Sequence, residues 1–342
     1  MTALSHRARA SVVTALVLIA AGVAAADDYS YQGRIRYDNP ELVTLRKREL
    51  QPLGACLRIA SYNLQDFSDA IKDGDARTPA QAQNQAQGAA LNLSEIDPDI
   101  AIVEEVENDR ALGMLNQRMK KPYPFAAITR FASKGDYTEK LNIAVLSRLP
   151  LAGLREMDFG YLEGPGRPPR GLLSFMVDLG DDRRLLVYGV HLKSNYGEQE
   201  KDRAKRRNAM SILVNDAESV RAKYPKFQWE VLVAGDTNVD PDDSQFATDP
   251  SFEPLKGWID LWRGIPLPER VTLPTRLGDP TNTFPAVTFD RFFVSPEMTN
   301  HPWVVGVPHS LQRGTDTNSV FTLPGDNGHV SDHYPIYLDL AR

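Results

Sequence analysis

The chain has 342 residues and a formal net charge of −6 at pH 7. That charge argues against a protein that coats nucleic acid by charge alone, but metal-binding carboxylates would themselves make an enzyme acidic. A single cysteine, Cys56, excludes an intramolecular disulfide, so the hydrophobic core must hold the fold together. Cys56 stands at the start of an apolar strand and is predicted to be a small buried side chain.

Residues 1–26 have the composition of a secretory signal peptide. Arg7 and Arg9 precede the apolar run "SVVTALVLIAAGVA", and "AAA" before Asp27 offers a cleavage site. The apolar run is shorter than the roughly 20 residues that cross a bilayer, and no later stretch qualifies, so no stable membrane anchor is expected. The sequence therefore predicts a secreted or periplasmic protein.

Residues 27–56 are polar and irregular and are predicted to form an N-terminal arm, followed by one domain over 57–342. The patterns predict strands at 57–63, 99–106, 125–130, 141–148, 171–179, 184–192, 229–236, 286–295 and 335–340. They predict helices at 80–96, 109–119 and 198–224.

The predicted strands are nearly continuous apolar runs, which are typical of strands buried on both faces. Such strands need covering layers, so an α/β fold is expected. The segment 141–153 also suggests an antiparallel hairpin. The expected architecture is a mixed sheet, or two sheets packed face to face with helices outside.

Several of these strands end on a polar side chain. The residues concerned are Asn63, Glu104, Glu105, His191, Asp236 and Asn238. Asp332 and His333 come before the last strand instead. If that strand runs opposite to the others, its entrance lies beside their exits, and all these groups meet at one edge of the fold.

Taken singly, each residue also has an ordinary structural explanation. Asn63 could form a turn, Glu104–Asn108 an acidic helix start, and His191 part of the core. The motif "GDTNVDPDD" could be a turn, Asp290 could pair with Arg291, and Asp332-His333 could be a cap. Their joint occurrence at one edge favours a functional site.

Six segments resemble the signature blocks of the endonuclease/exonuclease/phosphatase superfamily, which includes pancreatic-type deoxyribonucleases. They are "YNLQDF", "IVEEVEN", "YGVHLKS", "VAGDTN", "TFDRFFVS" and "VSDHYPI". The resemblance spans Leu57–Leu340. It implies a four-layer α/β sandwich, with two mixed β-sheets packed face to face and helices outside. It also implies a Mg²⁺-dependent phosphodiesterase, with Mn²⁺ as an alternative ion.

The resemblance assigns roles to matching positions. It implies metal ligands at Asn63, Glu105 and Asp332. It implies catalytic roles for His191, Asp236, Asn238, Asp290 and His333. Three positions depart from the usual blocks: Glu104 replaces Gln, Thr237 replaces Phe, and Gln65 stands where abasic-site endonucleases carry a carboxylate. Gln65 and the predicted export both argue against abasic-site repair.

The predicted substrate is a nucleic-acid phosphodiester bond, cleaved by a monomer. The alternatives are a phosphatase, a sphingomyelinase-like phospholipid phosphodiesterase, or an exported binding module without turnover. Lys193 and the basic run Lys201–Arg207 could steer a polyanion, although the run could equally be a solvated helix face. Arg148 and Arg170 are further candidates for contacting phosphate.

Overall fold

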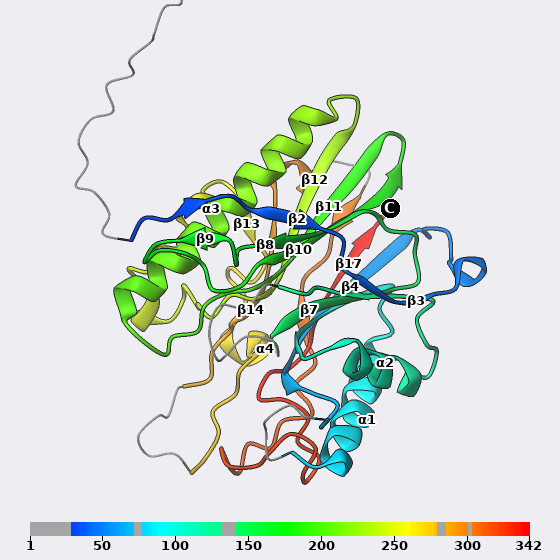
Figure 1. Ribbon diagram of the computed structural model, residues 1–342, viewed down its shortest axis with the longest axis vertical. Helices are drawn as coiled ribbons and strands as arrows, with labels where there is room; N and C mark the ends of the chain where they lie inside the picture. The colour runs from blue at the N-terminus through cyan, green and yellow to red at the C-terminus, as the bar shows by residue number, and fades with distance from the viewer. Residues whose placement is uncertain (1–28, 72–76, 132–140, 279–284, 300–302) are drawn as a thin grey trace, which may run out of the picture.

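The computed structural model describes residues 29–71, 77–131, 141–278, 285–299 and 303–342. The proposed signal peptide, residues 1–26, lies outside them. The described chain forms two large mixed β-sheets that lie face to face, with helices on their outer faces (Figure 1). This is the four-layer α/β sandwich that the resemblance implied.

The first sheet, called the β12 sheet, has seven strands in the described chain. In order across the sheet they are β13 (Ile259–Asp260), β14 (Asp290–Val294), β12 (Gln228–Asp236), β11 (Arg183–His191), β10 (Leu172–Gly180), β8 (Ala152–Asp158) and β2 (Arg36–Asp38). A separate short pair joins β1 (Gln32–Gly33) to β9 (Leu162–Glu163).

The second sheet, called the β4 sheet, has eight. In order they are β15 (Val304–Val305), β17 (Ile336–Ala341), β4 (Cys56–Phe67), β5 (Ile100–Val106), β7 (Asn142–Ser147), β6 (Phe125–Ile128) and β3 (Glu41–Leu45), with β16 (His309–Ser310) also paired to β17.

The inner faces of the two sheets pack into one core. Ile59 and Ile102 of the β4 sheet belong to the same buried cluster as Phe175 and Leu232 of the β12 sheet. Each Å² of apolar surface removed from water stabilises the fold by about 25 cal/mol. This layer therefore supplies the main driving force for folding.

Helices cover the outer faces. α1 (Pro79–Ile96) and α2 (Asp109–Arg118) pack on the β4 sheet, and α3 (Gln199–Lys223) packs on the β12 sheet. The remaining helices are short: α4 (Leu267–Arg270), η1 (Lys47–Glu49), η2 (Ser244–Phe246), η3 (Pro250–Leu255) and η4 (Pro296–Thr299).

Local sequence explains where the main helices begin. Thr78 and Gln81 form a reciprocal capping box at the start of α1, and Pro79 occupies the first helical position. Asn108 caps α2 by accepting the backbone N–H of Ala111 at 2.9 Å. No helix in the described part of the chain is long and apolar enough to cross a membrane.

The arm predicted for residues 27–56 is not irregular, because its described residues, 29–56, contain β1, β2, β3 and η1. β2 pairs with β8 at the edge of the β12 sheet, and β3 pairs with β6 at the edge of the β4 sheet. Both are edge strands, of three and five residues, and are too short to give a clear alternating pattern in the sequence. The arm therefore closes one side of the sandwich.

Two further expectations are corrected. The segment 141–153 is no hairpin, because β7 belongs to the β4 sheet and β8 to the β12 sheet. A short connection allows both a hairpin and a crossing between layers, and sequence does not distinguish them. Cys56 is exposed rather than buried, because it is the first residue of β4 and pairs with Ala341 near the end of the sheet.

Candidate active site

The strand register aligns three predicted site residues. His191 pairs with Asp236 across parallel β11 and β12, and Asp236 pairs with Asp290 across antiparallel β12 and β14. The last strand, β17, runs antiparallel to β4, as the sequence suggested. Its entrance therefore brings Asp332 and His333 to the edge where the other strands end.

A cavity of about 260 Å³ opens at this edge. Six of the eight predicted residues line it: Glu105, His191, Asp236, Asn238, Asp332 and His333. The other two, Asn63 and Asp290, hydrogen-bond to residues of the wall. The wall is completed by Asp66, Leu141, Arg170, Ser194, Asn195, Tyr196, Leu273 and Phe289. All eight predicted residues thus gather around one cavity.

Asn63 joins two carboxylates that come from different sheets. Its Nδ2 lies 3.1 Å from Glu105 Oε1 and 3.1 Å from Asp236 Oδ2. Its Oδ1 accepts the backbone N–H of Gln65 at 3.0 Å. Asn63 therefore presents its donor to the acidic groups, and its role as a metal ligand stays a prediction.

Two carboxyl groups of the cavity, those of Glu105 and Asp236, have raised pKa values. Burial, and then the neighbouring carboxylates of Asp66 and Asp332, raise the pKa of Glu105 to about 7. Burial raises the pKa of Asp236 to about 6, and the Asp290 carboxylate adds to the shift. A cation among these oxygens would relieve the repulsion, so the residues fit a divalent metal ion. Carboxylate and amide oxygens are the donors that Mg²⁺ prefers.

His333 is held by a buried carboxylate. Its Nδ1 lies 2.7 Å from Asp290 Oδ2, and Asp290 is fully buried. Burial disfavours the charged imidazole, but Asp290 and then Asp236 outweigh it and raise the pKa of His333 well above its ordinary value. The alternative pairing of Asp290 with Arg291 does not occur, because the Arg291 guanidinium binds Asp260 at 2.6 Å.

His191 faces the same carboxylates from the other side. Its Nε2 lies 3.3 Å from Glu105 Oε1 and 3.6 Å from Asp236 Oδ2. Burial, and then the positive charge of Arg170, lower the pKa of His191 well below its ordinary value. The Arg170 guanidinium donates to the backbone oxygen of Leu192 at 2.7 Å and lines the cavity. Arg170 therefore presents a positive charge to the cavity.

Two of the eight predicted site residues adopt left-handed backbone conformations, which non-glycine residues rarely do. Glu105 has φ 59° and Asn238 has φ 54°. Such residues cost on the order of 1–3 kcal/mol each and persist where the surroundings fix them. Here Glu105 Oε2 accepts the backbone N–H of Asp66 at 2.8 Å, and Asp236 Oδ1 accepts that of Asn238 at 2.8 Å. The acidic helix start considered for this segment is excluded, since Glu105 belongs to β5.

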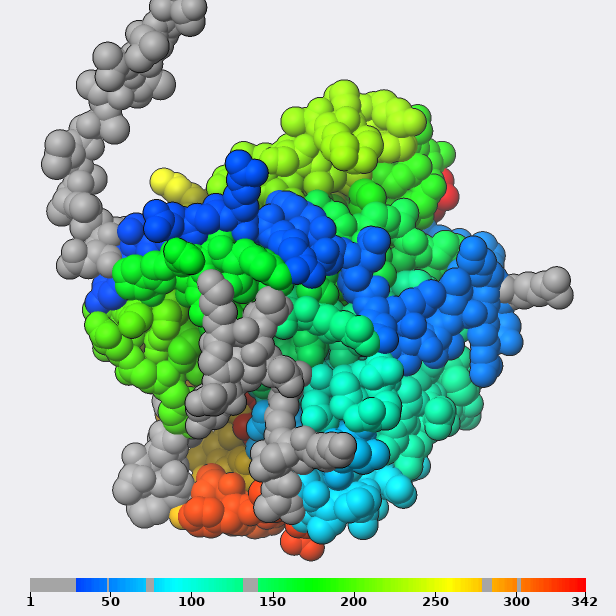
Figure 2. Space-filling model, in the orientation of Figure 1, coloured from blue at the N-terminus to red at the C-terminus, as the bar shows by residue number. Residues whose placement is uncertain are grey.

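Polar contacts that the sequence did not reveal hold the segment before β17. Ser331 Oγ donates to the backbone oxygen of Asn63 at 2.7 Å and accepts the backbone N–H of His333 at 3.0 Å. Gln65 Oε1 accepts the backbone N–H of Asp332 at 2.9 Å. Gln65, a departure from the abasic-site pattern, thus positions the Asp332 loop. In Figure 2 the orange chain leading to this loop lies beside cyan α1.

Sequence reasoning also missed Asp66, an exposed carboxylate at the cavity beside Glu105. It lies within the block "YNLQDF", immediately after the departing Gln65. The sequence signal for Asp66 is therefore a carboxylate one residue after the position where the resemblance would place one.

Most of the suggested basic contacts are engaged elsewhere. Arg148 binds Asp97 at 2.6 Å, so its expected contact with phosphate is not supported. In the run Lys201–Arg207, Arg206 is buried and binds Asp249 at 2.6 Å. The run is thus neither a fully solvated face nor a free cationic stripe, because intramolecular carboxylates neutralise part of it.

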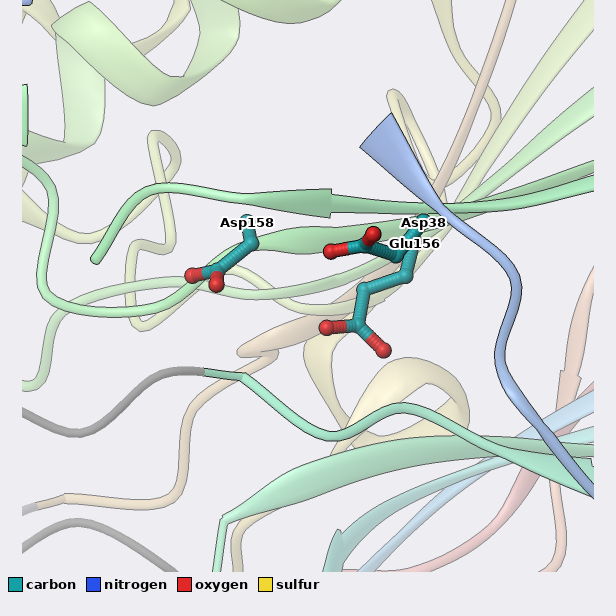
Figure 3. A group of neighbouring side chains, drawn as sticks. All are labelled: Asp38, Glu156 and Asp158. Atoms are coloured by element: carbon teal, nitrogen blue, oxygen red, sulfur yellow. The ribbon is translucent and has the colours of Figure 1, made fainter. Parts of the chain in front are cut away.

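A second acidic group lies on the outer β2–β8 edge of the β12 sheet. Asp38, Glu156 and Asp158 have ligand atoms within 4.8 Å of one another, the one such trio of acidic or histidine side chains among the described residues (Figure 3). Asp38 already pairs with Arg36, and Glu156 Oε2 accepts the backbone N–H of Arg130 at 2.6 Å. None of the three lines the active-site cavity.

The chain belongs to the endonuclease/exonuclease/phosphatase family, whose family model matches residues 60–333. Members of this family are generally hydrolases of phosphate esters. A search of curated proteins gave no match.

Solved structures show the same fold. D. rerio TDP2 complexed with a single-stranded DNA product is 18% identical, with a TM-score of 0.58 over 84% of this chain and 100% of that chain. An endonuclease/exonuclease/phosphatase from Beutenbergia cavernae is 18% identical, with a TM-score of 0.53 over 84% of this chain and 71% of that chain. A family protein from Leptotrichia buccalis is 14% identical, with a TM-score of 0.55 over 84% and 100%.

Proposed function

We propose that this protein is an exported, metal-dependent phosphodiesterase that cleaves nucleic-acid phosphodiester bonds, acting as a monomer. The observation that carries the proposal is the Asp290–His333 pair, which faces a cavity lined by acidic oxygens and a second histidine. An imidazole oriented by a carboxylate is suited to moving protons at a reacting centre. The export part of the proposal rests on residues 1–26.

Glu105 and Asp332 would hold the metal, with Asn63 and Asp66 beside them. When bound, Mg²⁺ supplies Lewis-acid polarisation of a phosphoryl oxygen, and Mn²⁺ is the alternative ion. Mg²⁺ usually keeps several waters and uses one or two protein carboxylates, so the site does not require three tightly packed acids.

The protein's own groups would handle the protons. Both imidazoles flank the same oxygen, since His191 Nε2 lies 3.6 Å and His333 Nε2 4.0 Å from Asp236 Oδ2. Asn238 Nδ2 donates to that oxygen at 2.9 Å and fixes its direction. Asp236 would orient the attacking water, one imidazole would take its proton, and the other would protonate the leaving oxygen. Arg170 would bind a non-bridging phosphate oxygen.

A nucleic-acid substrate is supported by the DNA product named for the D. rerio structure, which shares the fold. The proposal is tested with bis(4-nitrophenyl) phosphate in the presence of Mg²⁺ and of a chelator. Hydrolysis that stops with chelator supports a metal-dependent phosphodiesterase, whereas no hydrolysis supports a binding module. A panel of duplex DNA, single-stranded DNA, RNA, sphingomyelin and inositol phosphates then separates the substrate classes.

A further inference from the structure

A second cavity adjoins the active site. It measures about 200 Å³ and is lined by Asn195, Gln199, Asp202, Arg203, Gln245, Phe246 and Asp249. Asn195 belongs to the walls of both cavities. Phe246 of the second cavity packs edge-on against Phe289 of the first, with ring centroids 5.7 Å apart. The two cavities therefore share a wall and lie side by side.

The loop between the cavities is firmly held. Asn195 Nδ2 donates to the backbone oxygen of Asn238 at 2.8 Å. Lys193 Nζ binds Asp202 at 3.3 Å and donates to the backbone oxygen of Tyr196 at 2.6 Å. Gly197, at φ 137°, passes so close to Asp202 that a Cβ would lie 2.7 Å from its carboxylate. Such anchoring keeps the second cavity at a fixed distance from the reacting groups.

Both carboxylates of the second cavity, Asp202 and Asp249, are paired with cations. Asp249 binds Arg206 at 2.6 Å and lies 3.5 Å from Arg203, while Asp202 binds Lys193 and Lys205 at 3.3 Å each. Among the described residues of this cavity, no carboxylate is left unpaired to attract an organic cation. A neutral ligand group is compatible with this pairing.

The polar groups at the cavity's rim are amides. Gln199 and Gln245 are exposed, and their side-chain amides make no hydrogen bond to other described residues. Each amide offers a donor and an acceptor together, the combination with which glutamine and asparagine recognise base edges. Phe246 adds an aromatic wall, and Tyr196, which is 69% exposed, stands at the mouth of the first cavity. Aromatic rings of this kind stack on bases.

We propose that the cavity between Asn195 and Gln245 binds the nucleobase of the nucleotide joined to the scissile phosphate. Gln199 and Gln245 are then specificity-determining residues that touch the base and not the phosphate. Cavities that hold whole drug-sized ligands measure roughly 300–1,000 Å³, so about 200 Å³ suits one planar ring system. This inference rests on the proposed phosphodiesterase function.

The test compares substrates with and without a nucleobase. The substrates with a base are thymidine 5′-(4-nitrophenyl) phosphate and its adenosine counterpart, and the substrate without one is bis(4-nitrophenyl) phosphate. The double variant Gln199→Ala/Gln245→Ala should raise KM for the nucleoside substrates roughly tenfold, as expected when one or two substrate hydrogen bonds are lost. Its KM for bis(4-nitrophenyl) phosphate should not change. Gln117→Ala, an exposed glutamine on α2, is the matched control and should alter neither.

Equal effects on both kinds of substrate, or no effect on the nucleoside substrates, would overturn the inference and leave the phosphodiesterase function intact. A selective loss on 4-nitrophenylphosphorylcholine would overturn it in favour of a lipid headgroup. If the wild-type enzyme hydrolyses none of these substrates, the proposed function fails and the inference fails with it. Both alanines replace exposed side chains, so melting temperatures should match the wild type.

Discussion

Asp290 and His333, whose side chains meet at 2.7 Å, come from the two different sheets of the sandwich. Asp290 starts β14 in the β12 sheet, and His333 precedes β17 in the β4 sheet. The contact between Asn63 and Asp236 spans the sheets in the same way, at 3.1 Å. The site therefore exists only when the sheets are packed face to face, which couples the chemistry to the core between them.

Replacing Asp290 by Asn tests the orienting carboxylate. The amide keeps the shape but presents either a donor or an acceptor to His333 Nδ1 and carries no charge, so the imidazole loses its fixed orientation. We expect kcat for bis(4-nitrophenyl) phosphate to fall by about 10- to 100-fold, less than on removing the imidazole. Adding Asp290→Asn to a His333 variant should cost little more, because the two residues act as a unit. Multiplicative losses in the double variant would show that Asp290 acts separately.

Metal binding should be visible without any substrate. Mg²⁺ that binds only the folded state raises the melting temperature as its concentration rises. Glu105→Gln should shift this dependence to higher Mg²⁺ concentration, because a neutral amide is the weaker ligand.

Asp38→Asn is the matched control for the metal experiment, since it removes a carboxylate from the separate Asp38–Glu156–Asp158 trio. Its Mg²⁺ response should equal that of the wild type. If Asp38→Asn abolishes the response and Glu105→Gln does not, the metal binds at the edge of the β12 sheet and the assignment here is wrong.

Glu156 should make stability depend on pH. Burial, with a further contribution from Asp158, raises the pKa of Glu156 to about 7, above its ordinary value of 4.5. The folded state thus holds this proton more tightly than the unfolded state. The contribution of protonated Glu156 to the free energy of unfolding is therefore full below about pH 4.5 and is lost as pH rises to about 7.

Glu156→Gln removes that titration. The melting temperature of the variant minus that of the wild type should therefore increase from pH 5 to pH 7.5. Thermal scans across this pH range measure the difference. An unchanged difference between variant and wild type across the same range would mean that Glu156 titrates at its ordinary pKa when folded.

Export predicts a processed N-terminus. Protein recovered from the periplasm or medium should begin at or near Asp27, because "AAA" precedes it. N-terminal sequencing measures this directly. Recovery of chains that still begin with Met1 would argue against a cleaved signal peptide.

The sequence predicted the central strands and the three long helices because their patterns are strong and regular. It also predicted the gathering of the site, since His191 and Asp236 both end apolar strands and His333 precedes an antiparallel one. Strands β2 and β3 were not predicted, because strands of three and five residues are too short to give a clear alternating pattern. The assignment of β7 and β8 to different sheets depends on packing that no local pattern encodes.

Ion pairs within the protein also determine which arginine side chains are available to the active site. Arg170 and Arg148 look equivalent in sequence, yet only Arg170 reaches the cavity, while Arg148 is engaged by Asp97. Arg206 is similarly taken by Asp249. Such choices depend on contacts between residues far apart in the chain, so composition and spacing did not reveal them.

The most direct test of the account is the activity of a His333 variant measured beside its melting temperature. His333 is only 7% exposed, and alanine there would leave the buried Asp290 unpaired. His333→Asn keeps a hydrogen-bond donor for Asp290 but has no imidazole, and is the better choice. With Mg²⁺ and bis(4-nitrophenyl) phosphate, we predict a kcat about 10²- to 10⁴-fold below the wild type with nearly the same melting temperature. A folded His333→Asn protein with wild-type kcat would contradict the account, because the Asp290–His333 pair would then serve only the structure.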